Sequence, residues 1–314
     1  MDKENSISLQ VKQSWITALS VGTAALAVVA TTGGILSAFG HVHRTFVSLR
    51  GETVTLQGGG LYGHESVSMA AQGVGMDLVT LLVATPLLLV ATYLAGRGSL
   101  RGQLLRVGAF WYFTYSYLVI MFGVAYNPFF LIYVALFSAS LAGLILSLLS
   151  VDVGRLANHI SARFGRRTIA SIVLVISGMF FLLWLGRIVP SIVTGAPPSG
   201  LESYTTLSVQ AADLGLVIPL SVVTGILLLR RQPIGYLLAF PVVLFTATMG
   251  LGLVGMVTAM AALGTPVGLA DVAPAVATAV LGLAMSVHLV RNVKPTVLGF
   301  RTATALLKST AMTA

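Results

Sequence analysis

The chain has 314 residues, of which 56% are hydrophobic and 9% charged, and its formal net charge is +9. So little polar surface cannot cover a soluble globule, and the apolar runs have membrane length, so the composition predicts an integral membrane protein in contact with a lipid bilayer. The basic residues lie in short gaps between apolar runs, which argues against a nucleic-acid partner. The absence of cysteine excludes disulfides, thiolate metal sites and thiol redox chemistry.

The first half of the chain, residues 1–167, contains four runs long enough to span a membrane. Residues 15–40 exceed the length of a signal-peptide core, which predicts an uncleaved first span. A polar outer loop follows at 41–73, where residues 52–56 and 61–69 alternate around a glycine turn and predict a small hairpin. The remaining spans of this half are predicted at 74–95, 104–126 and 129–151.

The second half, residues 168–314, repeats this plan with a second polar loop at 191–212 and a basic tail after residue 290. Its four spans are predicted at 168–190, 213–229, 234–263 and 272–290. The predicted fold is therefore an all-α membrane protein of about eight transmembrane helices with a small outer-side hairpin.

The distribution of basic residues predicts the orientation. Eight spans place both termini on one side, and of the 18 Lys and Arg residues only Arg44, Arg50 and Arg187 fall on the other. Because cytoplasmic loops carry the excess of positive charge, we expect a plasma (inner) membrane protein with both termini and the basic tail in the cytoplasm. The hairpin and the 191–212 loop would then face outward.

The second predicted span of each half begins at an acid and contains a proline: Asp77 with Pro86, and Asp213 with Pro219. Since each half has four spans, two repeats would share one orientation and be related by an axis along the membrane normal. A chance likeness between alternating spans and loops explains the pattern equally well.

Two interpretations of Asp77 and Asp213 are open. At the outer ends of their spans, both acids suit capping of free backbone N–H groups. Ionisable residues at membrane depth beside proline-broken helices also mark binding sites. In either case we expect Asp213 to pair with Arg187, because consecutive spans are usually neighbours.

Outer-side histidines suggest a different site. His41, His43 and His64 with Glu65 would supply enough nitrogen and oxygen ligands for Zn or Cu. The His-x-His spacing is not diagnostic, and chance surface histidines explain it as well.

The third span carries an aromatic cluster at residues 110–117. Its first members are expected in the aromatic belt at the membrane interface. Tyr115 and Tyr117 lie deeper and are candidates for lining a solute cavity.

Three short motifs carry a resemblance: Leu61-Tyr62 ahead of Asp77, the turn at 126–128, and Pro-Pro-Ser-Gly-Leu at 197–201 ahead of Asp213. On these motifs the chain resembles a family of uncharacterised multi-pass prokaryotic integral membrane proteins. The resemblance implies the membrane fold and no activity.

No ATPase, metalloprotease or serine hydrolase signature is present, and nothing argues for catalysis. We therefore expect a transporter-like protein, or one that binds a small solute or a membrane partner, with an outward-facing vestibule near the Asp77 and Asp213 helix ends. Its binding residues would include Arg187, Tyr62 and the two prolines. The alternative is a membrane metalloprotein or redox component that uses the outer histidines. The sequence defines no cofactor.

Overall fold

The computed structural model describes residues 3–39 and 42–294. Its elements are, in chain order, α1 Lys3–Leu36, β1 Arg44–Val47, β2 Thr53–Leu56, α2 Val67–Val79, η1 Thr80–Ala84, α3 Thr85–Gly96, α4 Leu100–Gly123, α5 Phe130–Ser150, α6 Val153–His159, η2 Ala162–Phe164, α7 Arg166–Thr194, α8 Ser208–Ala212, η3 Asp213–Val217, α9 Ile218–Leu229, α10 Pro233–Ala262 and α11 Leu269–Arg291. In the described part of the chain, eight helices are long and apolar enough to cross a membrane. The predicted multi-span fold is confirmed.

The hairpin is confirmed, but its predicted second strand is wrong. β1 pairs antiparallel with β2, so the turn lies between them at 48–52. Residues 61–66 form a turn, and α2 then begins at Val67. The Ser66 hydroxyl accepts a hydrogen bond from the Met69 N–H, and this N-cap favours helix over the strand that the alternation predicts.

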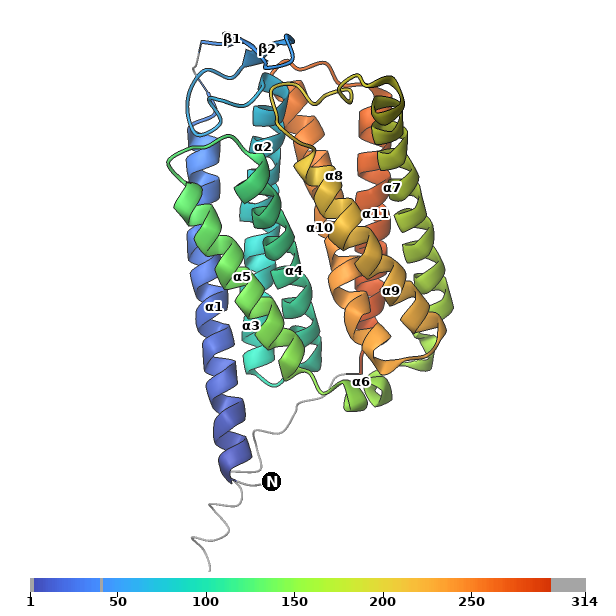
Figure 1. Ribbon diagram of the computed structural model, residues 1–314. Helices are drawn as coiled ribbons and strands as arrows, with labels where there is room; N and C mark the ends of the chain where they lie inside the picture. The colour runs from blue at the N-terminus through green and yellow to red at the C-terminus, as the bar shows by residue number, and fades with distance from the viewer. Residues whose placement is uncertain (1–2, 40–41, 295–314) are drawn as a thin grey trace, which may run out of the picture.

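Helices α4 and α10 form the centre of the bundle. Of the 18 most apolar consecutive residues in each of these two helices, 67% are buried, against 39% or less in the other six candidate spans. α10 packs against α2 and α4 from the first half and against α9 and α11 from the second. Figure 1 shows α1 to α5 on one side and α7 to α11 on the other, with β1–β2 at one end, here called the hairpin end, and α6 at the opposite end.

Glycine allows α2 and α10 to approach closely. A Cβ added at Gly75 would overlap the backbone of Gly255, and a Cβ at Gly255 would lie 2.6 Å from the carbonyl oxygen of Gly75. Membrane helices associate through such small residues because the lipid tails provide no hydrophobic drive between helices. The glycine pair therefore fixes how near the two halves of the chain lie.

Two spans contain a π-helical segment just before a proline. In η1 the N–H of Thr85 reaches the carbonyl of Thr80, and in η3 the N–H of Ile218 reaches that of Asp213. Pro86 and Pro219 follow immediately, and proline has no N–H to continue the regular ladder. The wider turn accommodates each proline without ending the span.

At the α6 end, the C-terminal part of α11 is tied to the connection between α6 and α7. The Ser161 N–H donates to the Asn292 carbonyl at 2.8 Å, and the Lys294 N–H donates to the His159 carbonyl at 2.8 Å. The Arg101 Nε donates to the Val293 carbonyl at 2.9 Å. These bonds join the α6–α7 connection and the first turn of α4 to the residues that follow α11.

Candidate functional site: two membrane-embedded carboxyl groups

Asp77 lies inside its span and is 5% exposed. The Tyr62 hydroxyl donates a hydrogen bond to Asp77 Oδ2 at 2.6 Å. The donor comes from the turn before α2, which folds back over the helix. Gly34 of α1 leaves the space that the Asp77 carboxyl group occupies, because a Cβ at Gly34 would overlap this carboxyl group.

The Tyr62 phenol is held in its protonated form. Burial, and then the neighbouring Asp77 carboxyl, raise the pKa of Tyr62 well above its usual value. A Cβ at Gly73 would lie 3.0 Å from the Tyr62 ring, so the ring rests directly on α2. Tyr62 therefore donates to Asp77 as a neutral phenol.

Asp213 receives two hydrogen bonds from other helices. The Tyr115 hydroxyl on α4 donates to Asp213 Oδ1 at 2.6 Å, and the Trp184 Nε1–H on α7 donates to Oδ2 at 2.9 Å. Both donors are neutral. The carboxyl group is partly buried and lies at the start of η3.

Helix α4 holds both π segments through tyrosine hydroxyls. Tyr112 and Thr80, the first residue of η1, share a hydrogen bond of 2.6 Å. Tyr115 bonds Asp213, the first residue of η3. Asp213 is thus the first residue of its π segment, whereas Asp77 lies almost one turn before the first residue of η1.

The capping interpretation of the two acids is wrong. α2 begins at Val67 and α8 at Ser208, so neither Asp77 nor Asp213 stands at the start of its span. Their carboxyl groups accept from phenol and indole donors on other elements instead.

The predicted ion pair of Arg187 with Asp213 is also wrong. Within residues 3–39 and 42–294, Arg187 makes no hydrogen bond or ion pair, and its Nε is buried without a partner. Its guanidinium lies instead against Gly200, where an added Cβ would lie 2.7 Å from Nη2.

Glu65 joins three loops at the hairpin end. Its side chain, 2% exposed, accepts hydrogen bonds from the Tyr204 hydroxyl and, at 2.5 Å, from the Ala125 N–H. Arg50 reinforces the junction by donating to the carbonyls of Glu202 and Tyr204, each at 2.7 Å. Burial raises the pKa of Glu65, and the bonds from Tyr204 and Ala125 offset this only in part.

The structure does not bring the predicted metal ligands into a cluster. Among the described residues no group of three His, Asp or Glu side chains is placed to hold a metal ion. His43 and His64 are exposed, and Glu65 is engaged with Tyr204. His41 lies outside the described residues, so its part in a site stays a prediction.

The aromatic residues of α4 are interior residues, and the prediction of a belt is wrong for its first members. Phe110, Tyr112 and Phe113 are fully buried. Tyr117, 2% exposed, stacks on Tyr133 with ring centroids 6.2 Å apart. Because α4 is central, its aromatic side chains pack between helices.

Sequence reasoning missed a second group of polar residues. Thr80, Tyr112 and Trp184 were not singled out, since the hydrogen bonds that define their roles join residues distant in the sequence. Arg106, counted from the sequence only among the basic residues of the terminal side, is fully buried in α4, and its one hydrogen bond within the described residues goes to Gln13 Oε1, at 3.3 Å.

Two hollows open near the hairpin end. One is lined by α7 residues together with Ser199 and Gly200, and the other by the β1–β2 turn together with 197–200. Neither Asp77 nor Asp213 lines either hollow. The vestibule expected near the two acids therefore stays a prediction.

The fold and these buried polar contacts define a polytopic helical membrane protein. No known protein family, no curated protein and no solved structure matches the chain. The resemblance to an uncharacterised prokaryotic family therefore stays a prediction.

We predict that Gly34→Ala lowers thermal stability in detergent by about 1–3 kcal/mol, because the new Cβ must displace the Asp77 carboxyl group from a packed site. Gly22→Ala on the same helix is the control, because its Cβ would meet nothing within 4 Å. Alanine at Gly22 should be neutral or stabilising. Equal losses from both substitutions would show that the effect does not come from the Asp77 site.

We predict that the stability of the protein depends on pH through the buried Glu65. The folded-state pKa of Glu65 is raised, so its contribution to stability is full below the unfolded value of about 4.5 and is lost as pH rises through the folded value. The melting temperature of the native protein should therefore fall relative to that of Glu65→Gln as pH increases. A difference that moves the other way would show that the bonds from Tyr204 and Ala125 favour the carboxylate.

Proposed function

We propose that the protein is a transporter-like membrane protein that moves a small solute, with Asp77 and Asp213 as the proton-binding groups of its pathway. The observation that carries the proposal is that each acid lies within a candidate span and, among the described residues, accepts hydrogen bonds from neutral donors alone. A carboxylate away from water is costly without a cation, so uptake of a proton or of a cationic solute relieves that cost.

The helix breaks support the proposal. η1 and η3 are π segments followed by Pro86 and Pro219, and such interruptions in membrane helices are typical of binding sites. Asp213 begins one break, and Asp77 lies just before the other. Backbone groups at a break are available to a solute because the regular ladder is interrupted.

The same features support an internal repeat of two four-span halves, 1–167 and 168–314. Each half has a π segment at the same distance before a proline in its second span. The two halves share one orientation in this arrangement, with α4 and α10 as their corresponding third spans. The pathway then lies where these central helices meet the broken ones.

For orientation, we propose that the hairpin end faces outward and that both termini are cytoplasmic. The support is the excess of Lys and Arg at the α6 end. The protein would lie in the plasma (inner) membrane, and solute would enter between the loops of the hairpin end.

The proton-binding role of Asp213 can be followed through its indole donor. In a Trp15→Phe/Trp111→Phe background, Trp184 emission reports on the Asp213 carboxyl group 2.9 Å away. We expect the emission to change in one step over about pH 4–9, and Asp213→Asn to abolish the step. Asp77→Asn is the control, because Asp77 has a different donor. Emission independent of pH would contradict a proton-binding role for Asp213.

Transport itself is tested in proteoliposomes that contain a pH-sensitive dye and are exposed to a panel of small solutes. We expect solute-dependent proton movement that Asp77→Asn and Asp213→Asn both reduce by about tenfold or more. Asp271→Asn is the control, since this exposed acid caps the start of α11. If Asp77→Asn and Asp213→Asn move protons as fast as the native protein, the two acids are not the proton-binding groups of transport.

The orientation is tested by cysteine labelling, since the chain contains no cysteine. Leu49, 97% exposed at the β1–β2 turn, and Ala162, exposed at the α6 end, are the two positions. Leu49→Cys should react with an impermeant maleimide in intact cells, and Ala162→Cys only after lysis. The reverse pattern would invert the topology.

A further inference from the structure

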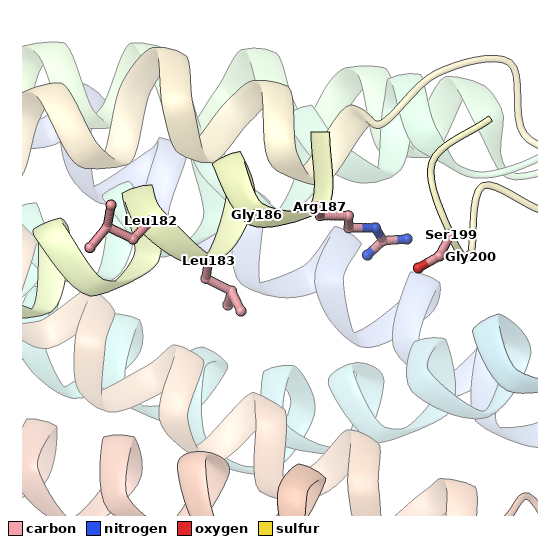
Figure 2. Close-up of a pocket in the computed structure, with 6 residues that line it drawn as sticks. All are labelled: Leu182, Leu183, Gly186, Arg187, Ser199 and Gly200. Atoms are coloured by element: carbon pink, nitrogen blue, oxygen red, sulfur yellow. The ribbon is translucent and has the colours of Figure 1, made fainter. Parts of the chain in front are cut away.

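The hollow beside α7 is lined by an arginine, Arg187, that has no partner among the described residues. The hollow has a volume of about 700 Å³ and is lined by Leu182, Leu183, Gly186, Arg187, Ser199 and Gly200. Figure 2 shows Arg187 extending from α7 toward Ser199 and Gly200. Arg187 has no hydrogen bond or ion pair within the described ranges, and its Nε is buried without a partner.

An unpaired guanidinium within a membrane span is costly, so this cation calls for an anion. The planar group of arginine matches phosphate oxygens with paired N–H donors. Close packing against Gly200 restricts the guanidinium, which reduces the entropy lost on binding. Ser199, exposed at the same hollow, carries a hydroxyl that can donate to the same anion.

The other wall of the hollow is apolar. Leu182 is 69% exposed and Leu183 58% exposed, and both lie about one turn deeper in the membrane than Arg187. A Cβ added at Gly186 would meet nothing within 4 Å, so the space between the leucines and the arginine is open. A ligand with an anionic head group and an apolar chain below it would therefore fit this hollow.

The packing of α7 explains why this face is free. α1 packs against both α2 and α5, whereas α7 packs principally against α9 and has at most marginal contact with α11 in the described ranges. The second half of the bundle is therefore less closed beside α7 than the first half is beside α1. This opening gives molecules of the bilayer access to the hollow.

We propose that this hollow binds a phospholipid from the leaflet at the hairpin end, with Arg187 holding the phosphate and Leu182 and Leu183 contacting an acyl chain. The site is separate from the carboxyl groups of the proposed transport pathway, because neither Asp77 nor Asp213 lines it. Its occupant is recognised by its phosphate and by the chain below it.

The test measures binding of phosphatidylglycerol to the delipidated full-length protein in detergent, by native mass spectrometry. Arg187→Gln should weaken binding roughly tenfold or more, because it removes a charge-assisted hydrogen bond. Arg44→Gln is the matched control, since Arg44 is an exposed arginine at the same end and outside the hollow. Equal binding by these two variants would overturn the proposal.

A second pair of variants keeps Arg187 intact. Gly186→Leu fills the hollow and should also block phosphatidylglycerol, whereas Gly178→Leu, on the same helix and with equally open space, should not. This pair answers the question even where Arg187→Gln fails to fold. Binding unchanged by Gly186→Leu would place the lipid elsewhere and refute the proposal.

Two further probes identify the source of the phosphate. Diacylglycerol, which lacks phosphate, should bind much more weakly than phosphatidylglycerol, and inorganic phosphate should not displace the lipid. Displacement by inorganic phosphate at equal concentration would assign the hollow to a free phosphate-bearing solute instead. A dimer that Gly186→Leu dissociates, without lipid binding, would assign it to a second copy of the chain. Either outcome would overturn the lipid proposal.

Discussion

Inside a bilayer no water is available, so a polar group that lacks a partner within the protein is costly. The central helix α4 meets this constraint for both interrupted spans, since Tyr112 bonds Thr80 and Tyr115 bonds Asp213. Each bond anchors a π segment at its first residue, where the wider turn begins. The position of the broken spans, and of the carboxyl groups beside them, thus depends on two phenol groups almost one turn apart on a single helix.

The number of spans was predictable because a run of about 20 apolar residues has few alternatives to crossing the membrane. The residues at which two of the spans begin could not be predicted in the same way. α2 starts at Val67 and α8 at Ser208, where polar and small residues lower the local hydropathy although the backbone is already helical. The same stretch misled the hairpin assignment, because the alternation at 61–69 does not distinguish a strand from a capped first turn.

The two acids could be identified from the sequence as candidates, but their partners could not. Asp213 takes its donors from α4 and α7, which lie far from it along the chain, and periodicity within a helix carries no information on such contacts. The expected partner, Arg187, lies almost one turn beyond Trp184 toward the hairpin end and faces the 199–200 loop instead. Opposite charge and similar depth were not enough to predict the partner of Asp213, because two neutral donors with good hydrogen-bond geometry lie closer to its carboxyl group.

The order of these partners along the chain has a consequence for biosynthesis. Tyr62 precedes Asp77, and both Tyr115 and Trp184 precede Asp213. When the chain is inserted from its N-terminus, each acid enters the membrane after its donors have been made. Neither carboxyl group therefore depends on a later part of the chain for the donors that it has in the folded protein.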